Sequence, residues 1–369
     1  MKYLESLVPR GHSFRLSDEL FMISKSELDV LISLGPAVSK FMTASQAIIQ
    51  MALLDLDLSA RWKRVRELLF TDINAQYKKT LHLHPQRNSR VTRVDFMVDQ
   101  KGEFKIAEID PLNKHGLGFA LACRNESGNG DRQKILSYFG ELMHNYDEMC
   151  IILSPKDKFF TLEQTYFAAK LSESTGKPVS VISGEDLEEL KRKALSERCC
   201  FLDCPVLDNE TANEALIKVF VSSPKRFIIP PKHWMGNKSL MAFVHDNESG
   251  VSGLLELLLD TAALKKMKFH TPPTFVGEPW DDDALVMKKV MSSGAKGVFF
   301  EGRVSDRDVI YQRFVPQRTY LLDGKNQFIR LAAHYVGSRL AELTVTASEK
   351  IPVHGNSSSI NYHVGLKTD

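Results

Sequence analysis

Strands and helices alternate along residues 149 to about 230, and this alternation strongly limits the possible folds. Two apolar strands, Ile151–Leu153 and Val179–Ile182, are each followed by a stretch with helical spacing, about Leu162–Thr175 and Glu185–Leu195. Strands that alternate with helices of this length pair in parallel through right-handed crossovers. The pattern predicts a small unit in which helices cover a parallel sheet, and it argues against an all-helical or all-β chain.

The segments around this unit predict a different architecture. Helical spacing runs from about Ser17 to Lys79 with Pro36 as an expected interruption, and a second helical stretch runs from Asn237 to about Lys268. From Ala284 to Val336 apolar strands alternate with turns, among them the hairpin signal Asp323-Gly324. We therefore expect a mixture of α/β and α+β architecture. The expected regions are a helical N-terminal region (1–90), a core hairpin region (91–148), a Rossmann-like unit (149–235) and an antiparallel region (236–369).

Charge and hydropathy exclude several classes of function. The 369 residues carry a net charge of only +2, so no broad basic field is expected to bind nucleic acid or an anionic membrane. No uncharged apolar run reaches the length of about 18 residues that a membrane helix needs. The start lacks the apolar core of a secretory signal, so we expect a cytoplasmic protein. Its five cysteines have no zinc-site spacing and are predicted to be reduced, mostly buried thiols. The oligomeric state is not predicted.

The first candidate site is a carboxylate hairpin. Strands at Val91–Val98 and Phe104–Ile109 are joined by a polar turn, and a period of two places Ile106, Glu108 and Asp110 on one face. Antiparallel register brings Asp95 within cross-strand reach of Glu108. Such a cluster of like charges can share hard cations, and Mg²⁺ prefers oxygen ligands. Spacing alone leaves open whether this is a magnesium site or a solvated face of an edge hairpin.

The second candidate is a lysine followed by a loop of small residues. A strand carrying Lys288 runs into residues 291–297, which include Ser293, Gly294, Lys296 and Gly297. Small residues let backbone N–H groups approach a phosphate, and a lysine adds a point charge. The loop does not have the P-loop pattern, and taken alone it is better explained as an ordinary hairpin loop.

A third candidate is the apolar strand Val309–Val315. Its backbone could pass the edge of an adenine, offering donors and acceptors between apolar walls. A buried structural strand is the alternative.

These motifs together resemble one superfamily. The magnesium motif of the ATP-grasp ligases is similar to Arg93-Val94-Asp95-Phe96 with Glu108-Ile109-Asp110-Pro111. Their phosphate-binding lysine and glycine loop is similar to Val286-Met287-Lys288 with residues 292–298. Their adenine-binding hinge is similar to residues 311–316. The magnesium motif precedes the glycine loop, as in the circularly permuted branch that includes eukaryotic-type glutathione synthetases and glutathionylspermidine synthetases. Asp110 replaces the usual Asn, which puts the metal preference in doubt, and Lys289 replaces the usual Pro, which leaves a strand hydrogen bond available.

The resemblance implies an ATP-grasp fold with a Rossmann-like pre-ATP-grasp domain, and an ATP-dependent carboxylate–amine ligase that works through an acylphosphate on an amino acid or small peptide. The implied cofactors are ATP and Mg²⁺, the latter expected as a pair of ions, and the implied partners are a small-molecule carboxylate and an amine. The alternative is a nucleotide-binding interaction protein with a degenerate site. The implied metal ligands are Asp95, Glu108 and Asp110; the nucleotide contacts are Lys238, Lys288, Ser293, Gly294, Lys296, Gly297, Gln312, Phe314 and Val315; and the catalytic candidates are Arg318 and Arg330, for which an ordinary ion pair is the alternative.

Overall fold

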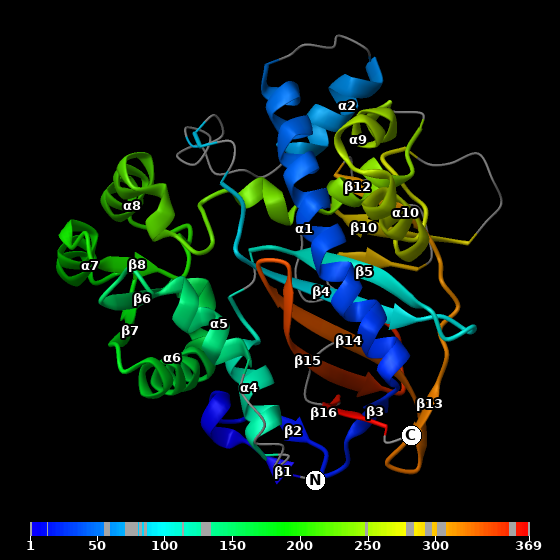
Figure 1. The fold of residues 1–369 in the computed structure, drawn as a ribbon, viewed down its shortest axis with the longest axis horizontal. Coiled ribbons are helices and arrows are strands. Elements are labelled where there is room, and N and C mark those ends of the chain that lie inside the picture. Colours follow the sequence, from blue (N-terminus) through cyan, green and yellow to red (C-terminus); the bar gives the residue numbers. More distant parts are fainter. Residues whose placement is uncertain are drawn as a thin grey trace.

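A large mixed sheet forms the centre of the molecule (Figure 1). The computed structural model describes residues 2–12, 14–54, 60–70, 80, 83–84, 87–112, 114–126, 134–247, 250–277, 284–291, 297–300, 308–353 and 359–367. The sheet has nine strands in the order β1-β2-β16-β15-β14-β4-β5, with β13 paired to β14 and β3 to β16. The strands are β1 (Lys2–Tyr3), β2 (Arg15–Leu16), β3 (Phe21–Ile23), β4 (Val91–Val98), β5 (Phe104–Asp110), β13 (Tyr320–Leu322), β14 (Lys325–Val336), β15 (Arg339–Ser348) and β16 (Ile360–Leu366).

One face of this sheet is apolar and is covered by the long helix α1 (Lys25–Leu53), which crosses it in Figure 1. The helix begins with a capping box, in which the Ser24 side chain accepts from the Glu27 amide and the Glu27 carboxylate accepts from the Ser24 amide. Pro36 was expected to interrupt the helix but lies inside it. The carbonyl that loses its hydrogen bond belongs to Ile32, which is exposed, so water can satisfy it.

The opposite face of the sheet is polar because the strands alternate. Val94 and Phe96 of β4 and Leu331 of β14 point into the core beneath α1, so their neighbours Arg93 and Asp95 point the other way. This polar face carries the candidate site.

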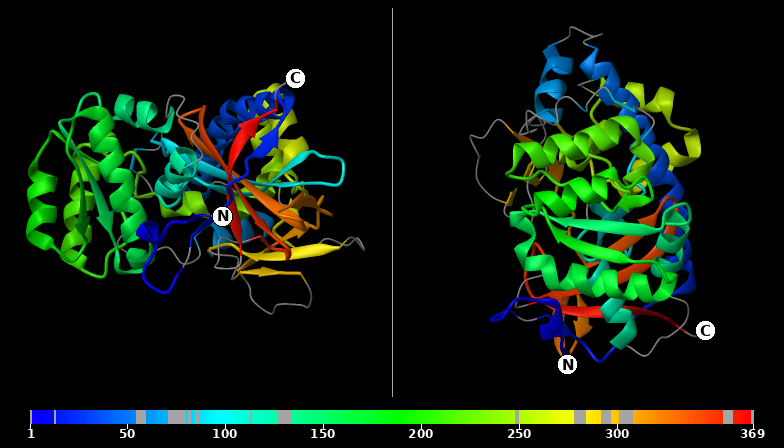
Figure 2. Two further views of the ribbon diagram at one scale, coloured as in Figure 1. Left: turned by 90° about the horizontal axis from the view of Figure 1, so that it is seen from below. Right: turned by 90° about the vertical axis from the view of Figure 1, so that its left-hand side faces the viewer.

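The strand–helix alternation is confirmed as a three-stranded parallel sheet in the order β7-β6-β8 (Figure 2). Gly176 ends the first helix of this unit with φ of +66°, the left-handed conformation that favours glycine. We call residues 148–229 the Rossmann-like layer. Its elements are β6 (Glu148–Leu153), the 3-10 helix η2 (Pro155–Phe160), α6 (Thr161–Thr175), β7 (Val179–Ser183), α7 (Leu187–Leu195), β8 (Cys199–Phe201), α8 (Glu210–Ser222) and η3 (Pro224–Arg226).

A smaller antiparallel sheet with the strand order β11-β10-β12-β9 packs beside a group of short helices. The strands are β9 (Thr274–Phe275), β10 (Leu285–Lys289), β11 (Val298–Phe299) and β12 (Val309–Arg313), and the helices are η4 (His233–Gly236), η5 (Lys238–Val244), α9 (Val251–Leu258) and α10 (Thr261–His270). The remaining elements are η1 (Glu5–Leu7), α2 (Ala60–Leu69), α4 (Leu117–Glu126) and α5 (Lys134–Leu142).

Several expectations need correction or completion. The N-terminal region is not only helical, since β1, β2 and β3 join the large sheet. Strands β15 and β16 and helices α4 and α5 were not predicted. The Asp323-Gly324 turn is confirmed, because both residues have positive φ (48° and 75°) and Leu322 pairs with Lys325 across it.

Two further expectations concern membranes and thiols. None of the described helices combines the length and apolar composition that a membrane crossing requires. All five cysteines are buried and form no disulfide.

Candidate functional site

The carboxylate hairpin β4–β5 carries a bulge that sets the direction of its acidic side chains. Asp95 pairs with Glu108 while the next residue, Phe96, pairs with Ile106, so Ala107 is an extra residue in β5. Glu108 and Asp110 share a face as predicted, but the expectation that Ile106 lies with them was wrong. Ile106 and Phe104 point into the core, and the bulge turns the carboxylates to the polar face.

Asp95 is held by arginines. Arg93 Nε and Nη2 donate to its two carboxylate oxygens at 2.7 and 3.1 Å, and Arg330 Nη1 lies 3.6 Å away. Burial would raise the pKa of Asp95, but Arg93 and Arg330 lower it overall. Among the described residues there is no group of three acidic, histidine or cysteine side chains that could hold a metal. Asp95 lies opposite Glu108 as expected, but in this structure its carboxylate oxygens face two guanidinium groups.

Glu108 and Asp110 remain as a carboxylate pair beside this cluster. Burial raises the pKa of Asp110; Arg93, 4.0 Å away, opposes this, and the negative charges of Glu108 and Asp95 add to it. Asp110 is therefore protonated more easily than an exposed aspartate, and a cation bound beside it would favour its ionised form. Two carboxylates of this kind fit Mg²⁺, which proteins usually bind through one or two carboxylates while substrate phosphates and water complete the shell.

Two lysines from other elements meet the hairpin. Lys238 Nζ, at the start of η5, lies 3.0 Å from Glu108 Oε1, and Lys288 Nζ, on β10, donates to the Ala107 carbonyl at 2.9 Å. Lys288 also donates to Gln312 Oε1 of β12 at 2.6 Å. Desolvation lowers the pKa of Lys288 to about 8, although Glu108 opposes this. The structure therefore gathers Lys238, Lys288 and Gln312 at the edge of β5, where Figure 1 shows β10 and β12 beside it.

Other predicted nucleotide contacts lie around this edge or outside the described residues. Ser293, Gly294 and Lys296 are not among the described residues. The Gly297 carbonyl accepts from the Lys289 amide at 2.8 Å, where β10 leads back to β11. Phe314 and Val315, directly after β12, are half-buried.

The two arginine candidates are separated. Arg330 points to Asp95, and its buried Nε has no hydrogen-bond partner within the described part of the chain. Arg318 is exposed, and its guanidinium lies 5.3 Å from the Tyr320 ring centroid. A Cβ on Gly102, in the β4–β5 turn, would lie 3.6 Å from Arg318 Nη1. The structure thus brings Arg318 to the far end of the hairpin and not to the carboxylates.

Two residues of the site were not predicted. Arg93 was quoted only as part of a motif, and His334 of β14 pairs with it across the strands. His334 is buried, and desolvation with the nearby Arg93 lowers its pKa to about 3, so its imidazole is neutral. Alternation of side chains along β4 places Arg93 with Asp95 and could have identified it; His334 required the strand order.

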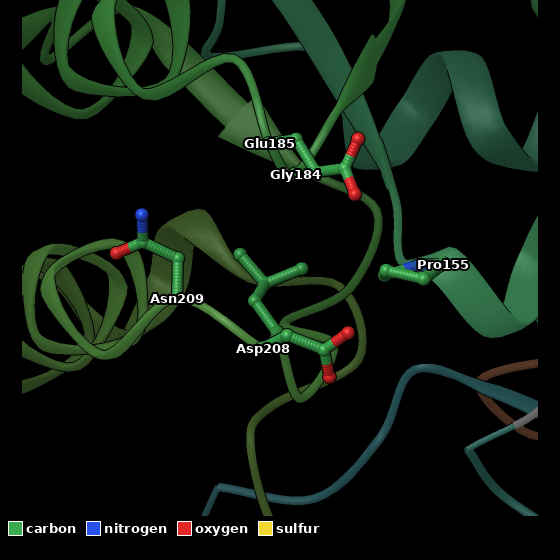
Figure 3. Close-up of a pocket in the computed structure, with 6 residues that line it drawn as sticks. Pro155, Gly184, Glu185, Asp208 and Asn209 are labelled. Atoms are coloured by element: carbon green, nitrogen blue, oxygen red, sulfur yellow. The ribbon is translucent and has the colours of Figure 1, made fainter.

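A separate pocket of about 290 Å³ lies at the carboxyl ends of β6 and β7, beside the loop that follows β8 (Figure 3). None of the predicted site residues lines it. Its lining residues are Pro155, Gly184, Glu185, Leu207, Asp208 and Asn209.

No family model matches this chain, and no curated protein matches its sequence. Among solved structures it is similar to a glutathione synthetase-like effector from Globodera pallida in its apo form, with a TM-score of 0.57 and 10% identity over 96% of this chain and 90% of that one. The two chains share a fold. A structure named for a gamma-glutamylcysteine synthetase from Methylobacillus flagellatus covers 85% of this chain and 84% of its own at 9% identity, and its TM-score of 0.33 is too low to indicate a common fold.

Proposed function

We propose that this chain is an ATP-dependent ligase of the ATP-grasp type that joins the carboxylate of an amino acid or small peptide to an amine. The observation that carries the proposal is the convergence of Lys238 and Lys288, from two separate elements, on the hairpin that bears Glu108 and Asp110. The overall fold shared with a glutathione synthetase-like protein supports it.

The site contains cations and carboxylates suited to positioning a phosphoryl group. Phosphoryl transfer asks mainly for alignment and charge neutralisation, so a covalent nucleophile is not needed. In the proposed reaction a substrate carboxylate oxygen attacks the γ-phosphorus of ATP, ADP leaves, and the amine then displaces phosphate from the resulting acylphosphate. Lys238 and Lys288 would hold phosphate oxygens, with Gln312, Phe314 and Val315 near the base.

Glu108 and Asp110 would hold Mg²⁺, which supplies charge neutralisation for the phosphates. In the described structure Lys238 forms an ion pair with Glu108. When the nucleotide binds, Lys238 would leave this carboxylate and pair with a phosphate oxygen. Arg330, whose Nε has no partner among the described residues, and the neighbouring Arg93 would suit a substrate carboxylate, since guanidinium groups bind carboxylates through two donors.

The experiment is titration calorimetry of the full chain with a nonhydrolysable ATP analogue, with and without Mg²⁺. We expect binding that requires Mg²⁺ and is lost in Glu108→Gln. Glu103→Gln is the matched control, because Glu103 lies at the turn of the same hairpin and pairs with Lys105. No binding by the unaltered protein would refute the proposal.

A second candidate, a nucleotide-binding interaction protein with a degenerate site, is favoured by the engagement of Asp95 with arginines. The two candidates differ in turnover. A ligase releases ADP when supplied with the correct amino acid and amine, whereas the degenerate protein binds the analogue but releases no ADP in such a screen.

A further inference from the structure

A buried lysine, Lys114, connects the Rossmann-like layer to the loop that follows the proposed metal carboxylates. Only 3% of Lys114 is exposed, yet its Nζ has three oxygen partners. It donates to the Ile152 carbonyl of β6 at 2.6 Å and forms ion pairs with Asp157 at 2.9 Å and Asp203 at 3.0 Å. All three partners belong to the Rossmann-like layer, at the carboxyl ends of β6 and β8.

The layer also holds the backbone around this lysine. The Lys114 carbonyl accepts from Gln164 Nε2 at 2.8 Å, and Glu163 Oε1 accepts from the Gly118 amide at 2.5 Å. His115 Nε2 lies 2.9 Å from Asp157 Oδ1. Both side-chain and main-chain contacts thus hold the start of α4 and the loop before it against the Rossmann-like layer.

The two ends of the same loop lie at the proposed active site. At one end, the Leu112 amide donates to Asp110 Oδ1 at 3.2 Å. At the other end, Gly116 has φ of +93°, and a Cβ added there would lie 3.5 Å from His334 Cε1 and 4.0 Å from Arg93 Nη1. The described residues of this loop, 110–112 and 114–116, therefore run from the proposed metal carboxylate to the layer at Lys114 and back to the Arg93 guanidinium.

Lys114 is charged in this position. Burial would lower its pKa, but Asp203 and Asp157 raise it above the ordinary lysine value. Buried ion pairs of this kind add little net stability over apolar packing, and their best-attested role is to fix one arrangement. The arrangement fixed here is that of the loop between Asp110 and Gly116.

We propose that Lys114 is a positioning residue that fastens the loop between Asp110 and Gly116 to the Rossmann-like layer, so that the place of the Asp110 carboxylate depends on the layer. This inference rests on the proposed function for its role in metal and nucleotide binding. Lys114 itself touches neither the proposed metal ligands nor the phosphate-binding lysines.

The test compares two buried lysines of the same layer. Lys193, on α7, is 4% exposed and pairs with Glu148 at the amino end of β6, on the edge of the layer away from the loop. We expect Lys114→Met and Lys193→Met each to lower the unfolding temperature. Only Lys114→Met should raise the Mg²⁺ concentration needed for half-maximal binding of the ATP analogue, by about 10-fold or more, as loss of outer-sphere support usually does.

Hydrogen–deuterium exchange provides a readout that needs no ligand. In Lys114→Met, amides of the segment 110–118 should exchange at least about 10-fold faster, while in Lys193→Met this segment stays as in the unaltered protein. Equal exchange in the two variants would overturn the inference. If the unaltered protein does not bind the analogue, the proposed function fails, and exchange alone still decides whether Lys114 holds the loop. If Lys114→Met does not fold, the same exchange measurement can compare Asp203→Asn, which removes a partner of Lys114, with Glu148→Gln, which removes the partner of Lys193.

Discussion

At the scale of single residues, Lys288 combines a low pKa with a position suited to phosphate binding. In the free protein it loses its proton near pH 8, because burial disfavours the ammonium form. A bound phosphate would favour that form and raise the pKa. We therefore expect binding of the ATP analogue at pH 8 to take up about half a proton per chain, and affinity to fall as pH rises further.

Calorimetry in buffers of different ionisation enthalpy measures this uptake. Near pH 6.5, where Lys288 is already charged before binding, the uptake from this group should vanish. The same uptake at both pH values, or none at pH 8, would show that Lys288 does not meet the phosphates.

Asp95 and Glu108 face each other across the hairpin but should behave differently. Asp95 is 3% exposed and neutralises two half-buried arginines, whereas the Glu108 side chain is 31% exposed. We expect Asp95→Asn to lower the free energy of unfolding by about 3 kcal/mol, because it removes the buried carboxylate that neutralises both guanidinium groups. Glu108→Gln should cost less than about 1 kcal/mol.

Denaturant unfolding of the two variants checks this difference. If Asp95→Asn unfolds like the unaltered protein and instead loses Mg²⁺-dependent binding, then Asp95 is a metal ligand as its sequence suggested. The sequence could place a carboxylate at this position, but it could not show that Arg330, from a strand far along the chain, would meet it.

At the scale of elements, the contact of α1 with the sheet depends on Gly35. A Cβ there would lie 2.2 Å from the Ser338 carbonyl oxygen and 2.8 Å from the Tyr335 ring, so Gly35→Ala forces the helix away from β14. We expect a loss of about 3 kcal/mol in the free energy of unfolding.

Gly253→Ala in α9 is the matched control. In the described part of the chain, no atom beyond the helix's own backbone and the neighbouring residues lies within 4 Å of a Cβ at Gly253, so alanine should stabilise that helix by about 0.5–1 kcal/mol. Thermal and denaturant unfolding compare the two variants. Similar effects for both would mean that helix propensity, and not the close approach to the sheet, decides the stability.

The elements also show why sequence reasoning succeeded in some places and failed in others. The Rossmann-like layer was predicted because its strands are apolar and its helices local. Strand β15 was missed although it shows the period of two: Glu342, Thr344 and Thr346 on the polar face alternate with Leu343, Val345 and Ala347 in the core, so its pattern could have predicted it. The bulge at Ala107 was missed because a period of two counts every residue, and an extra residue is visible only once the partner strand is known.

At the scale of the whole molecule, the burial of every cysteine gives a direct test of the packing. Burial raises the pKa values of Cys123, Cys150, Cys199 and Cys200, so their thiolate forms are scarce. We expect none of the five thiols to react rapidly with an aromatic disulfide reagent in the native protein, and all five to react in concentrated denaturant. A thiol that reacts within seconds in native buffer would contradict the described core.

The joining of distant segments was the least predictable property of the molecule. The resemblance of short motifs brought the carboxylate hairpin and the Lys288 strand into one site, and the structure places them together. The arginine candidates illustrate the limit. Arg318 and Arg330 both lie beside the carboxyl-terminal end of β4, but Arg330 points back to Asp95, whereas the Arg318 guanidinium lies beside Tyr320 and the β4–β5 turn.

The pairing of β4 with β14 also sets the order in which the chain can fold. All of residues 99–324 lie between these two neighbouring strands, whereas β6, β7 and β8 pair with strands close in sequence. During synthesis the Rossmann-like layer can therefore fold before β14 is made, while the β4 edge of the β4–β5 hairpin has no strand to pair with. A ribosome-bound chain that stops before residue 325 would hold a finished layer beside an unprotected strand, the stage at which a chaperone is most needed.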